Sequence, residues 1–309
     1  MRKTQASAAG LAGPAGGSRP APARARPPLK LRLRRAVSRF GGPVFAGVVI
    51  ALLYGPIIVL AAFSFNNSIV FSLPWAGFTT KWYSVAFGDA NLRAALINSI
   101  WVAAIVAPVS VVLGTLSAFP ITRFHFKLRG AAAMLVAAPL VIPWLVIAVS
   151  GQLYFHFLGV DLSQVTVLLM QIVVTFPLVT VLVAARLARF DRTQEEAAVD
   201  LGASQLQVLR YVLLPHLMPA LAAGFILAFS WSFNNFEISY FVSGFNQLFP
   251  VWVYSTLRHA TNLPEVNAIA TLVSGAEVAL VYLAWLFFTW RSGARTAREK
   301  ADALLEAVR

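Results

Sequence analysis

The sequence predicts an all-α polytopic membrane protein with six transmembrane helices and both termini in the cytoplasm. The composition is the first reason: of 309 residues, 59% are hydrophobic and only 12% are charged, and the mean hydropathy is +0.73. These values lie outside the range of soluble domains. The second reason is that six apolar windows are each long enough, about 20 residues, to cross a bilayer. The third is the distribution of positive charge along the chain.

The six apolar windows cover residues 44–64, 95–119, 131–151, 164–185, 219–242 and 266–289. An even number of spans leaves both ends of the chain on one side of the membrane. Of the 25 Lys and Arg residues, all but Lys81, Arg93 and Arg258 lie in the two tails or in the connections after the second and fourth windows. Cytoplasmic segments carry the excess of Lys and Arg, so the termini are predicted to be cytoplasmic.

The ends of the chain flank one predicted transmembrane domain, residues 43–290. Residues 1–42 are rich in Ala, Pro and Arg without apolar periodicity, which predicts a basic, disordered cytoplasmic tail. Residues 291–309 form a second cytoplasmic tail. The net charge of +13 favours anionic membrane lipid as a partner rather than nucleic acid, because the basic residues flank the spans and no aromatic stacking platform accompanies them. The first apolar run is too long for a signal peptide and is expected to be retained.

A charged segment with two helix-start signals separates the fourth and fifth windows. Thr193 and Glu196 have the spacing of a capping box, which predicts a helix start at Thr193. Gly202 tolerates the positive φ of a helix end, so this helix should stop there. Ser204 and Gln207 repeat the capping-box spacing and predict a second short helix immediately afterwards.

The second short helix is predicted to end at Pro215 and Pro219, which would let the fifth span start in a new direction. The result is a helix-turn-helix elbow that presents Glu195, Glu196 and Ala198 away from the membrane. An amphipathic loop lying on the lipid surface is the alternative. Such helices usually carry Lys or Arg on the polar face, whereas this one begins with two acids, so a docking element for a cytoplasmic partner fits better.

The stretch EEAAVDLGASQLQVLRYVLLPHLMP resembles the EAA loop of permease subunits of binding-protein-dependent ATP-binding-cassette importers. The resemblance implies the type I (MetI-like) permease fold, and it assigns the loop to coupling with a separate ATPase dimer. It also implies an extracytoplasmic solute-binding protein and a second permease, which could be a different chain or another copy of this one; the polyamine resemblance given below favours a different chain. The chain has no G-x-x-x-x-G-K-[ST] motif, so we expect no enzymatic activity and no cofactor of its own, with ATP and Mg²⁺ bound by the partner. The residues assigned to coupling are Glu195, Glu196, Ala197, Ala198, Asp200, Leu201, Gly202, Ala203, Leu214, Pro215 and Pro219.

The solute is indicated less directly, by a resemblance to the second permease of spermidine and putrescine importers. FSWSFNNFEISYFVSGFNQLFP and the earlier SFNNS and GFTTKWY stretches carry it. On a helix, Glu237 shares a face with Phe233, Asn234, Tyr240 and Phe241 at spacings of three and four, and the rings could hold an ammonium group. The sequence departs from that family where Asn234, Asn235 and Trp144 replace common acids, so a neutral or anionic solute stays open. The candidate path residues are Phe233, Asn234, Asn235, Glu237, Tyr240, Phe241 and Glu277.

Several of these residues have a second interpretation. The aromatic face could equally consist of interfacial anchors or packing residues. Glu277 lies near the middle of the sixth window, where an ionisable group is expensive; it could line the path or be a protonated acid that bonds to a neighbouring helix. Glu265 suits the start of a helix dipole and is assigned no function. The four His residues show no ligand spacing, so no metal site is expected.

Two other classes of membrane protein fit the sequence less well. An intramembrane serine protease is disfavoured because the chain has no G-x-S-x-G motif. A self-contained secondary transporter could use broken helices such as those at Pro139, Pro143 and Pro177, but it has no need of a twice-capped acidic elbow.

Overall fold

The fold is helical throughout the part of the chain that the structure describes. The structure is a computed structural model, and it describes residues 29–69, 74–259 and 263–307. Over these ranges the only β contact is one isolated bridge between Asn66 and Phe78. The all-α prediction is therefore confirmed. The predicted disorder of residues 1–28 lies outside the described residues.

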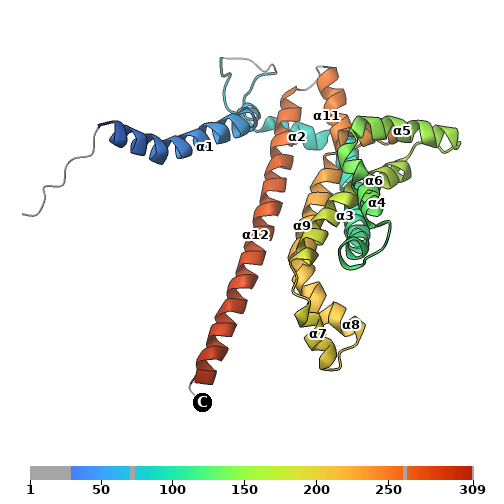
Figure 1. Cartoon of the computed structure of the whole chain (residues 1–309). Helices are drawn as coiled ribbons and strands as arrows, with labels where there is room; N and C mark the ends of the chain where they lie inside the picture. The colour runs from blue at the N-terminus through green and yellow to red at the C-terminus, as the bar shows by residue number, and fades with distance from the viewer. Residues whose placement is uncertain (1–28, 70–73, 260–262, 308–309) are drawn as a thin grey trace, which may run out of the picture. The chain divides into compact units, whose positions relative to one another are not determined.

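The chain divides between Pro56 and Ile57 into two compact units. Most of helix α1 (Leu29–Phe63) belongs to the first unit, and it begins at Leu29, so residues 29–42 are helical where the composition predicts an irregular tail. All other helices belong to the second unit (Figure 1). They are α2 (Lys81–Gly88), α3 (Ala90–Arg123), α4 (Arg129–Val141), α5 (Trp144–Phe157), α6 (Gln164–Ala188), α7 (Thr193–Asp200), α8 (Gln205–Val208), the π-helical turn η1 (Leu209–Leu213), α9 (Leu214–Phe233), α10 (Phe236–Val242), α11 (Phe249–Arg258) and α12 (Leu263–Ala307).

Five of the six predicted spans appear as long apolar helices among the described residues. They cover Gly42–Phe63, Ala90–Arg123, Gln164–Ala188, Gln205–Phe233 and Leu263–Leu286. The third window, 131–151, is not a straight span, because α4 and α5 are bent by 99° relative to each other. The bend falls before Pro143, where Ile142 adopts an extended backbone with ψ of 130°. A residue that precedes proline avoids the helical region, which ends α4 at this point.

The fifth window is also broken, although the sequence predicts one helix over 219–242. Helix α9 ends at Phe233, and α10 starts at Phe236 after Asn234 and Asn235. The Asn235 side chain accepts a hydrogen bond from the backbone N–H of Ile238 (3.0 Å), so it caps α10. The Asn234 amide donates to the carbonyl of Ser230 (3.0 Å) at the end of α9. Asparagine favours such caps over helix interiors, which explains the break.

A buried glutamine on α6 joins the two halves of the broken span. The Ser232 hydroxyl of α9 donates to Gln171 Oε1, and Gln171 Nε2 donates to Ser239 Oγ of α10 (3.2 Å). All three side chains are buried. Unpaired polar groups are costly in an apolar environment, so these hydrogen bonds hold α9 and α10 in fixed positions against α6.

The centre of the second unit is a close contact of α3, α6 and α9. Val179 of α6 lies between two glycines, one on each neighbouring helix. A Cβ added to Gly114 of α3 would lie 2.7 Å from Val179 Cβ, and one added to Gly224 of α9 would lie 3.2 Å from Val179 Cγ1. Small residues let helix backbones approach closely in membranes. Helix α12 joins this bundle through its N-terminal part, where Val266 and Ile269 are buried with residues of α2, α3 and α9.

We expect Gly114→Val to destabilise the bundle, because its side chain would collide with Val179 Cβ and with the backbone of α6. Overpacking of this kind costs about 1–3 kcal/mol. The thermal unfolding midpoint of the detergent-purified protein should fall by roughly 5 °C. Gly130→Val is the matched control, because that helical glycine has nothing within 4 Å of its Cβ position. Equal midpoints for the two variants would contradict the close contact.

Candidate functional site

The predicted coupling segment covers residues 193–219. Its elbow consists of α7, α8 and η1, residues 193–213, and lies at one end of the bundle, at the bottom of Figure 1. Helix α7 begins at Thr193, as the sequence predicts, but the predicted capping box of Thr193 and Glu196 does not form. The Thr193 backbone N–H donates instead to Asp191 Oδ1 (3.0 Å). Asp191 supplies the capping oxygen from the preceding turn, which leaves Thr193 inside the helix.

The turn between α7 and α8 agrees with the prediction. Gly202 has φ of +85°, and its N–H donates to the carbonyl of Val199 (2.8 Å), while the N–H of Ala203 donates to Ala198 (3.0 Å). These two bonds form a Schellman motif, which needs the positive φ that glycine adopts without strain. The capping box of Ser204 and Gln207 is confirmed. The Ser204 backbone N–H donates to Gln207 Oε1 (2.7 Å), and the Gln207 backbone N–H donates to Ser204 Oγ (3.4 Å).

Pro215 does not end the second short helix, in contrast to the prediction. The chain stays helical from Gln205 to Phe233. The turn before Pro215 widens into the π-helical turn η1, in which the Leu214 N–H donates to the Leu209 carbonyl. A widened turn makes room for the proline ring, so the elbow and the fifth span form one continuous rod.

The inner face of the elbow carries an ion pair that the sequence analysis missed. Glu195 Oε1 lies 2.7 Å from Arg123 Nη1 at the end of α3, and the two side chains are only 24% and 12% exposed. The Arg123 guanidinium also lies over the Phe190 ring, 5.6 Å from its centre. Ala198 is half-buried against the apolar core of α6 and α9. The prediction that Glu195 and Ala198 point outward is therefore wrong, because Arg123 and this core attract them inward.

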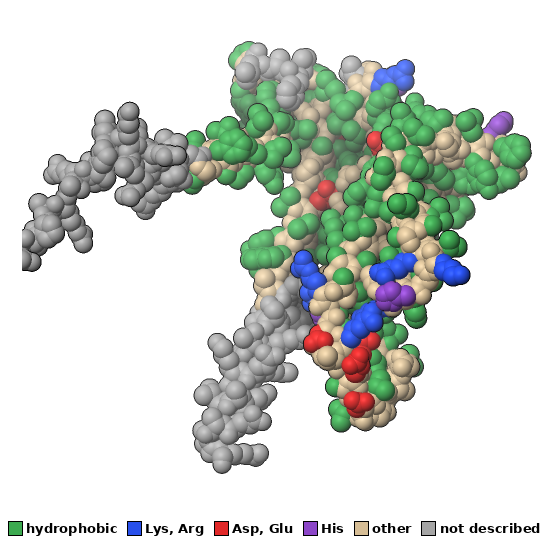
Figure 2. Space-filling model, in the orientation of Figure 1, with side chains coloured by type: hydrophobic (Ala, Val, Ile, Leu, Met, Phe, Trp, Pro, Cys, Tyr) green, Lys and Arg blue, Asp and Glu red, His purple; other side chains and the backbone are tan. Residues whose placement is uncertain are grey.

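The outer face of the elbow combines acids with two exposed leucines. Leu201 is 89% exposed and Leu206 is 73% exposed. Glu196, Ala197 and Asp200 are exposed as well. Figure 2 shows the acidic side chains gathered at this end of the molecule, with basic side chains just above them. Among the other predicted coupling residues, Leu214 and Pro219 are exposed, whereas Ala203 and Pro215 are half-buried.

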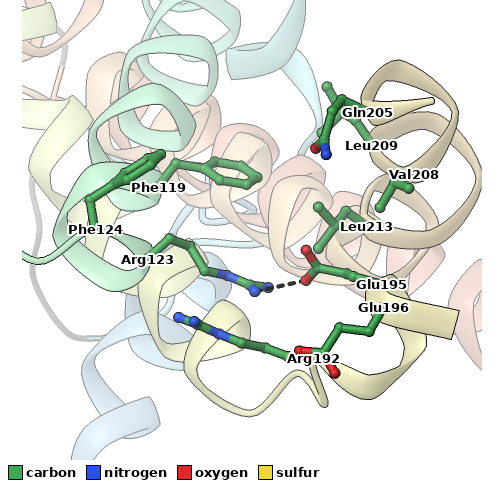
Figure 3. Close-up of a pocket in the computed structure, with 10 residues that line it drawn as sticks. All are labelled: Phe119, Arg123, Phe124, Arg192, Glu195, Glu196, Gln205, Val208, Leu209 and Leu213. Atoms are coloured by element: carbon green, nitrogen blue, oxygen red, sulfur yellow. Dashed lines mark ion pairs between the residues drawn. The ribbon is translucent and has the colours of Figure 1, made fainter. Parts of the chain in front are cut away.

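A groove of about 420 Å³ lies between the elbow and the end of α3. Figure 3 shows Phe119, Arg123 and Phe124 on the α3 side, facing Glu195 from α7. Arg123 was counted in the sequence only as one of the cytoplasmic positive charges. Its pairing with Glu195 joins segments far apart in the chain, so no local pattern could reveal it.

The predicted aromatic face of the fifth span is only partly formed. Glu237 shares α10 with Tyr240 and Phe241, but because the helix breaks at Asn234 it does not share a continuous helix with Phe233. Phe233 is buried; its ring stacks on Phe229 and lies tilted against Phe249, with centroid distances of 6.4 and 5.5 Å. Asn235 is buried as the cap of α10. These two side chains therefore build the fold rather than face an open path.

Glu277 and Asn234 are brought together from different helices. The Asn234 amide donates to Glu277 Oε1 of α12 (2.5 Å). The Ser230 hydroxyl of α9 donates to the same oxygen over 3.4 Å. Glu277 is half-buried, and Asn234 is exposed. Among the predicted path residues, these two form a polar cluster between two spans.

Next to Ser230 in the chain, Trp231 contacts Trp144 of α5 with a centroid distance of 4.8 Å.

Tyr240 and Phe241 lie on α10, beyond the break. Their rings meet edge to face at 5.2 Å. Tyr240 also contacts Phe236 of α10 and Tyr254 of α11. Over the described ranges, no group of three or more His, Cys, Asp or Glu side chains is placed to hold a metal ion.

Comparison with known proteins identifies the family. Residues 110–290 match the family described as the binding-protein-dependent transport system inner membrane component. This match covers more than half of the chain and includes the elbow. The chain belongs to this family. The resemblance that the EAA segment indicated is thereby confirmed.

Individual relatives of the inner membrane component extend the match over most of the chain. The putrescine transport system permease protein PotI of Escherichia coli (strain K12) is 36% identical over 241 residues, which cover 75% of this chain and 85% of the relative. The spermidine/putrescine transport system permease protein PotC of Haemophilus influenzae is 36% identical over 243 residues, covering 78% and 94%.

Solved structures support the fold. A chain of a bacterial ABC transporter involved in the import of the acidic polysaccharide alginate superposes with a TM-score of 0.62 at 20% identity, covering 82% of this chain and 97% of that one. A chain of an amino acid ABC transporter gives a TM-score of 0.53 at 19% identity, covering 68% and 98%. The predicted importer-permease fold is confirmed; the cytoplasmic orientation of the termini stays a prediction.

The Arg123–Glu195 pair predicts a specific pattern of charge reversals. Arg123→Glu and Glu195→Arg should each place two like charges in contact and loosen the elbow. Hydrogen exchange of amides in residues 193–213 should then accelerate about fivefold or more. The double reversal should restore much of the protection. Arg192→Glu, an exposed neighbour in the same groove, is the control and should leave exchange near the native rate. If the two single variants and the double variant showed the same exchange rates, the result would contradict the Arg123–Glu195 ion pair.

Proposed function

We propose that this chain is a permease subunit of an ATP-driven importer in a bacterial inner membrane, where it forms part of the translocation path for a polyamine such as putrescine or spermidine. Family membership and the names of the relatives support transport. The observation that carries the coupling role is the elbow itself: a capped turn that exposes two leucines directly after a run of acids.

The outer face of the elbow is the proposed docking surface for an ATPase subunit. Leu201 and Leu206 offer apolar contact area that neither the chain's own core nor, at this polar end, the lipid covers. The Schellman turn and the Ser204 cap give these leucines a fixed position. The chain itself supplies no cofactor; ATP and Mg²⁺ would be bound by the ATPase dimer.

Two further partners complete the proposal. A second permease, a different chain, would face this one across the path, and a solute-binding protein would deliver the cargo on the extracytoplasmic side. The family description includes dependence on a binding protein. A related alginate importer is known in complex with its ligand-bound periplasmic protein.

The polyamine assignment rests on Glu277 as well as on the relatives. A carboxylate in a membrane span usually marks a partner or a polar pathway. Asn234 and Ser230 hold its Oε1 in place, and Asn234 itself is exposed. An ammonium group approaching Asn234 would come next to the oriented carboxyl group of Glu277. Glu237 and Phe233 contribute less to this proposal than the sequence suggested.

Liposomes that contain the whole complex should take up spermidine or putrescine only when ATP is inside. Glu277→Gln keeps a hydrogen-bond acceptor for Asn234 but removes the charge, so uptake should fall about tenfold, as expected for the loss of a partly buried ion pair. Ser230→Ala, which removes only the longer of the two bonds, should change uptake less than threefold.

Normal uptake by Glu277→Gln would remove this residue from the path. Uptake of a neutral or anionic solute, without uptake of polyamines, would contradict the polyamine assignment. ATP-independent uptake by the chain alone would favour a secondary transporter.

The double variant Leu201→Ser, Leu206→Ser should lose its ATPase subunit during affinity purification, because the apolar docking contact is removed. Retention should drop at least about tenfold, measured by mass spectrometry of the eluate. Leu128→Ser is the control: Leu128 is exposed at the same end of the bundle but lies outside the elbow. Full retention by the double variant would show that the ATPase docks elsewhere.

A further inference from the structure

A cavity at the end of the bundle away from the elbow has no part in the function described so far. It has a volume of about 680 Å³ and lies between α5, α10 and the connection that precedes α6. Its lining includes the carboxylate of Asp161, the amide of Gln152 and the rings of Tyr240, Phe241 and Phe245. The sequence analysis assigned no role to Asp161, Gln152 or Phe245.

The walls of this cavity are held by specific contacts. Thr166 Oγ1 at the start of α6 donates to the carbonyl of Val242 at the end of α10 (2.6 Å). Gly244 follows with φ of +61°, and any Cβ there would collide with the carbonyl oxygen of Leu162. The end of α10 and the connection before α6 are therefore tied directly together, which gives the cavity a fixed shape.

Tyr240, on the aromatic side of the cavity, is also held in place by its neighbours. Tyr240 lies among Phe236, Phe241 and Tyr254, with centroid distances of 5.3, 5.2 and 5.6 Å. Phe241 is half-buried, whereas Phe245 is fully exposed to solvent. Ring faces attract cations through their quadrupole, and they do so best when the rings are already in place.

Asp161 provides a negative charge that the chain does not use itself. Its side chain is exposed, and across residues 29–69, 74–259 and 263–307 no hydrogen bond or ion pair engages its carboxylate. A carboxylate beside pre-positioned rings is the usual combination for binding an ammonium group. An anion would be repelled by Asp161. A neutral diol could donate hydrogen bonds to the carboxylate, but it would gain neither the ion pair nor the cation–π attraction that an ammonium group gains.

We propose that this cavity binds a primary ammonium group of the transported solute before the solute reaches Glu277. The proposal rests on the polyamine substrate class put forward above and adds a second site for it. Helix α10, which carries Tyr240 and Phe241, starts directly after the Asn234–Asn235 break. That break holds Asn234 against Glu277. The Glu277 cluster therefore contacts the chain just before α10, and the cavity is lined by the last residues of α10 and the turn after it. We infer that a flexible dication passes along this short helix from one carboxylate to the other.

The test uses the complete transporter complex and a photoactivatable primary diamine that carries a diazirine. We expect it to label peptides within residues 152–162 and 240–245, and spermidine to compete, whereas butane-1,4-diol does not. Asp161→Asn should reduce labelling about two- to fivefold, the size expected for the loss of one exposed ion pair while the rings remain. Asp161→Glu keeps the charge and should retain most of the labelling. Tyr240→Leu should reduce labelling, whereas Tyr240→Phe should not.

Two results would overturn the proposal: labelling that is unchanged in Asp161→Asn, or equal competition by the diol. The second would mean that the cavity is a general apolar surface, such as a contact for a partner protein. Polyamine uptake by the same liposomes separates this proposal from the preceding one. Uptake without Asp161-dependent labelling would remove only the cavity site. Asp161-dependent labelling without polyamine uptake would leave an ammonium site and remove the polyamine as cargo.

Discussion

The contact of Val179 with Gly114 and Gly224 is the constraint on which the rest of the structure depends. Between helices in lipid, close packing has to supply what the hydrophobic effect supplies in water, and here one side chain fills the space that two glycines leave. Helix α6 leads into the elbow and α9 leads out of it, so this contact also fixes where the elbow stands. A displacement of the elbow cannot be absorbed at so tight a crossing, because close-packed interiors transmit strain; it has to move the spans together.

The inner face of the elbow holds it against the bundle, and the outer face leaves apolar side chains exposed for contact with a partner. On the inner face, the Arg123–Glu195 pair adds α3 to the helices that meet there. A fully buried pair would lose much of its value to desolvation, but both side chains keep some exposure and Arg123 also lies over Phe190. On the outer face, Leu201 and Leu206 remain free of the chain's own core. The acid that begins the motif therefore stabilises the elbow, while its turn and second helix provide the apolar contact.

Features that depend on local signals could be predicted from the sequence, and those that depend on distant partners could not. The positive φ of Gly202 and the capping box of Ser204 follow from a few neighbouring residues, and the long apolar windows follow from composition. The predicted capping box of Thr193 and Glu196 was wrong, because the backbone N–H of Thr193 donates to the side chain of Asp191 instead. The single helix predicted over the fifth window was wrong because the two asparagines outweigh apolar periodicity. The bend in the third window falls at Pro143, one of the prolines that interrupt the apolar pattern in the sequence. The direction of Glu195 depends on Arg123, which only the folded chain brings near.

The asparagine pair shows how the proposed path residues can include a carboxyl group although the expected acids at positions 234 and 235 are missing. Asn235 is used as a helix cap and Asn234 as a donor to Glu277. An aspartate at position 234 would place a second carboxylate within hydrogen-bonding distance of Glu277, and two like charges so close cannot both stay ionised. Asn234 and Glu277 are therefore complementary: the amide that follows the end of α9 permits the carboxyl group on α12. The charge of this segment then depends on the contact between the two helices, so any movement that separates α9 from α12 would also remove the support that orients the carboxylate.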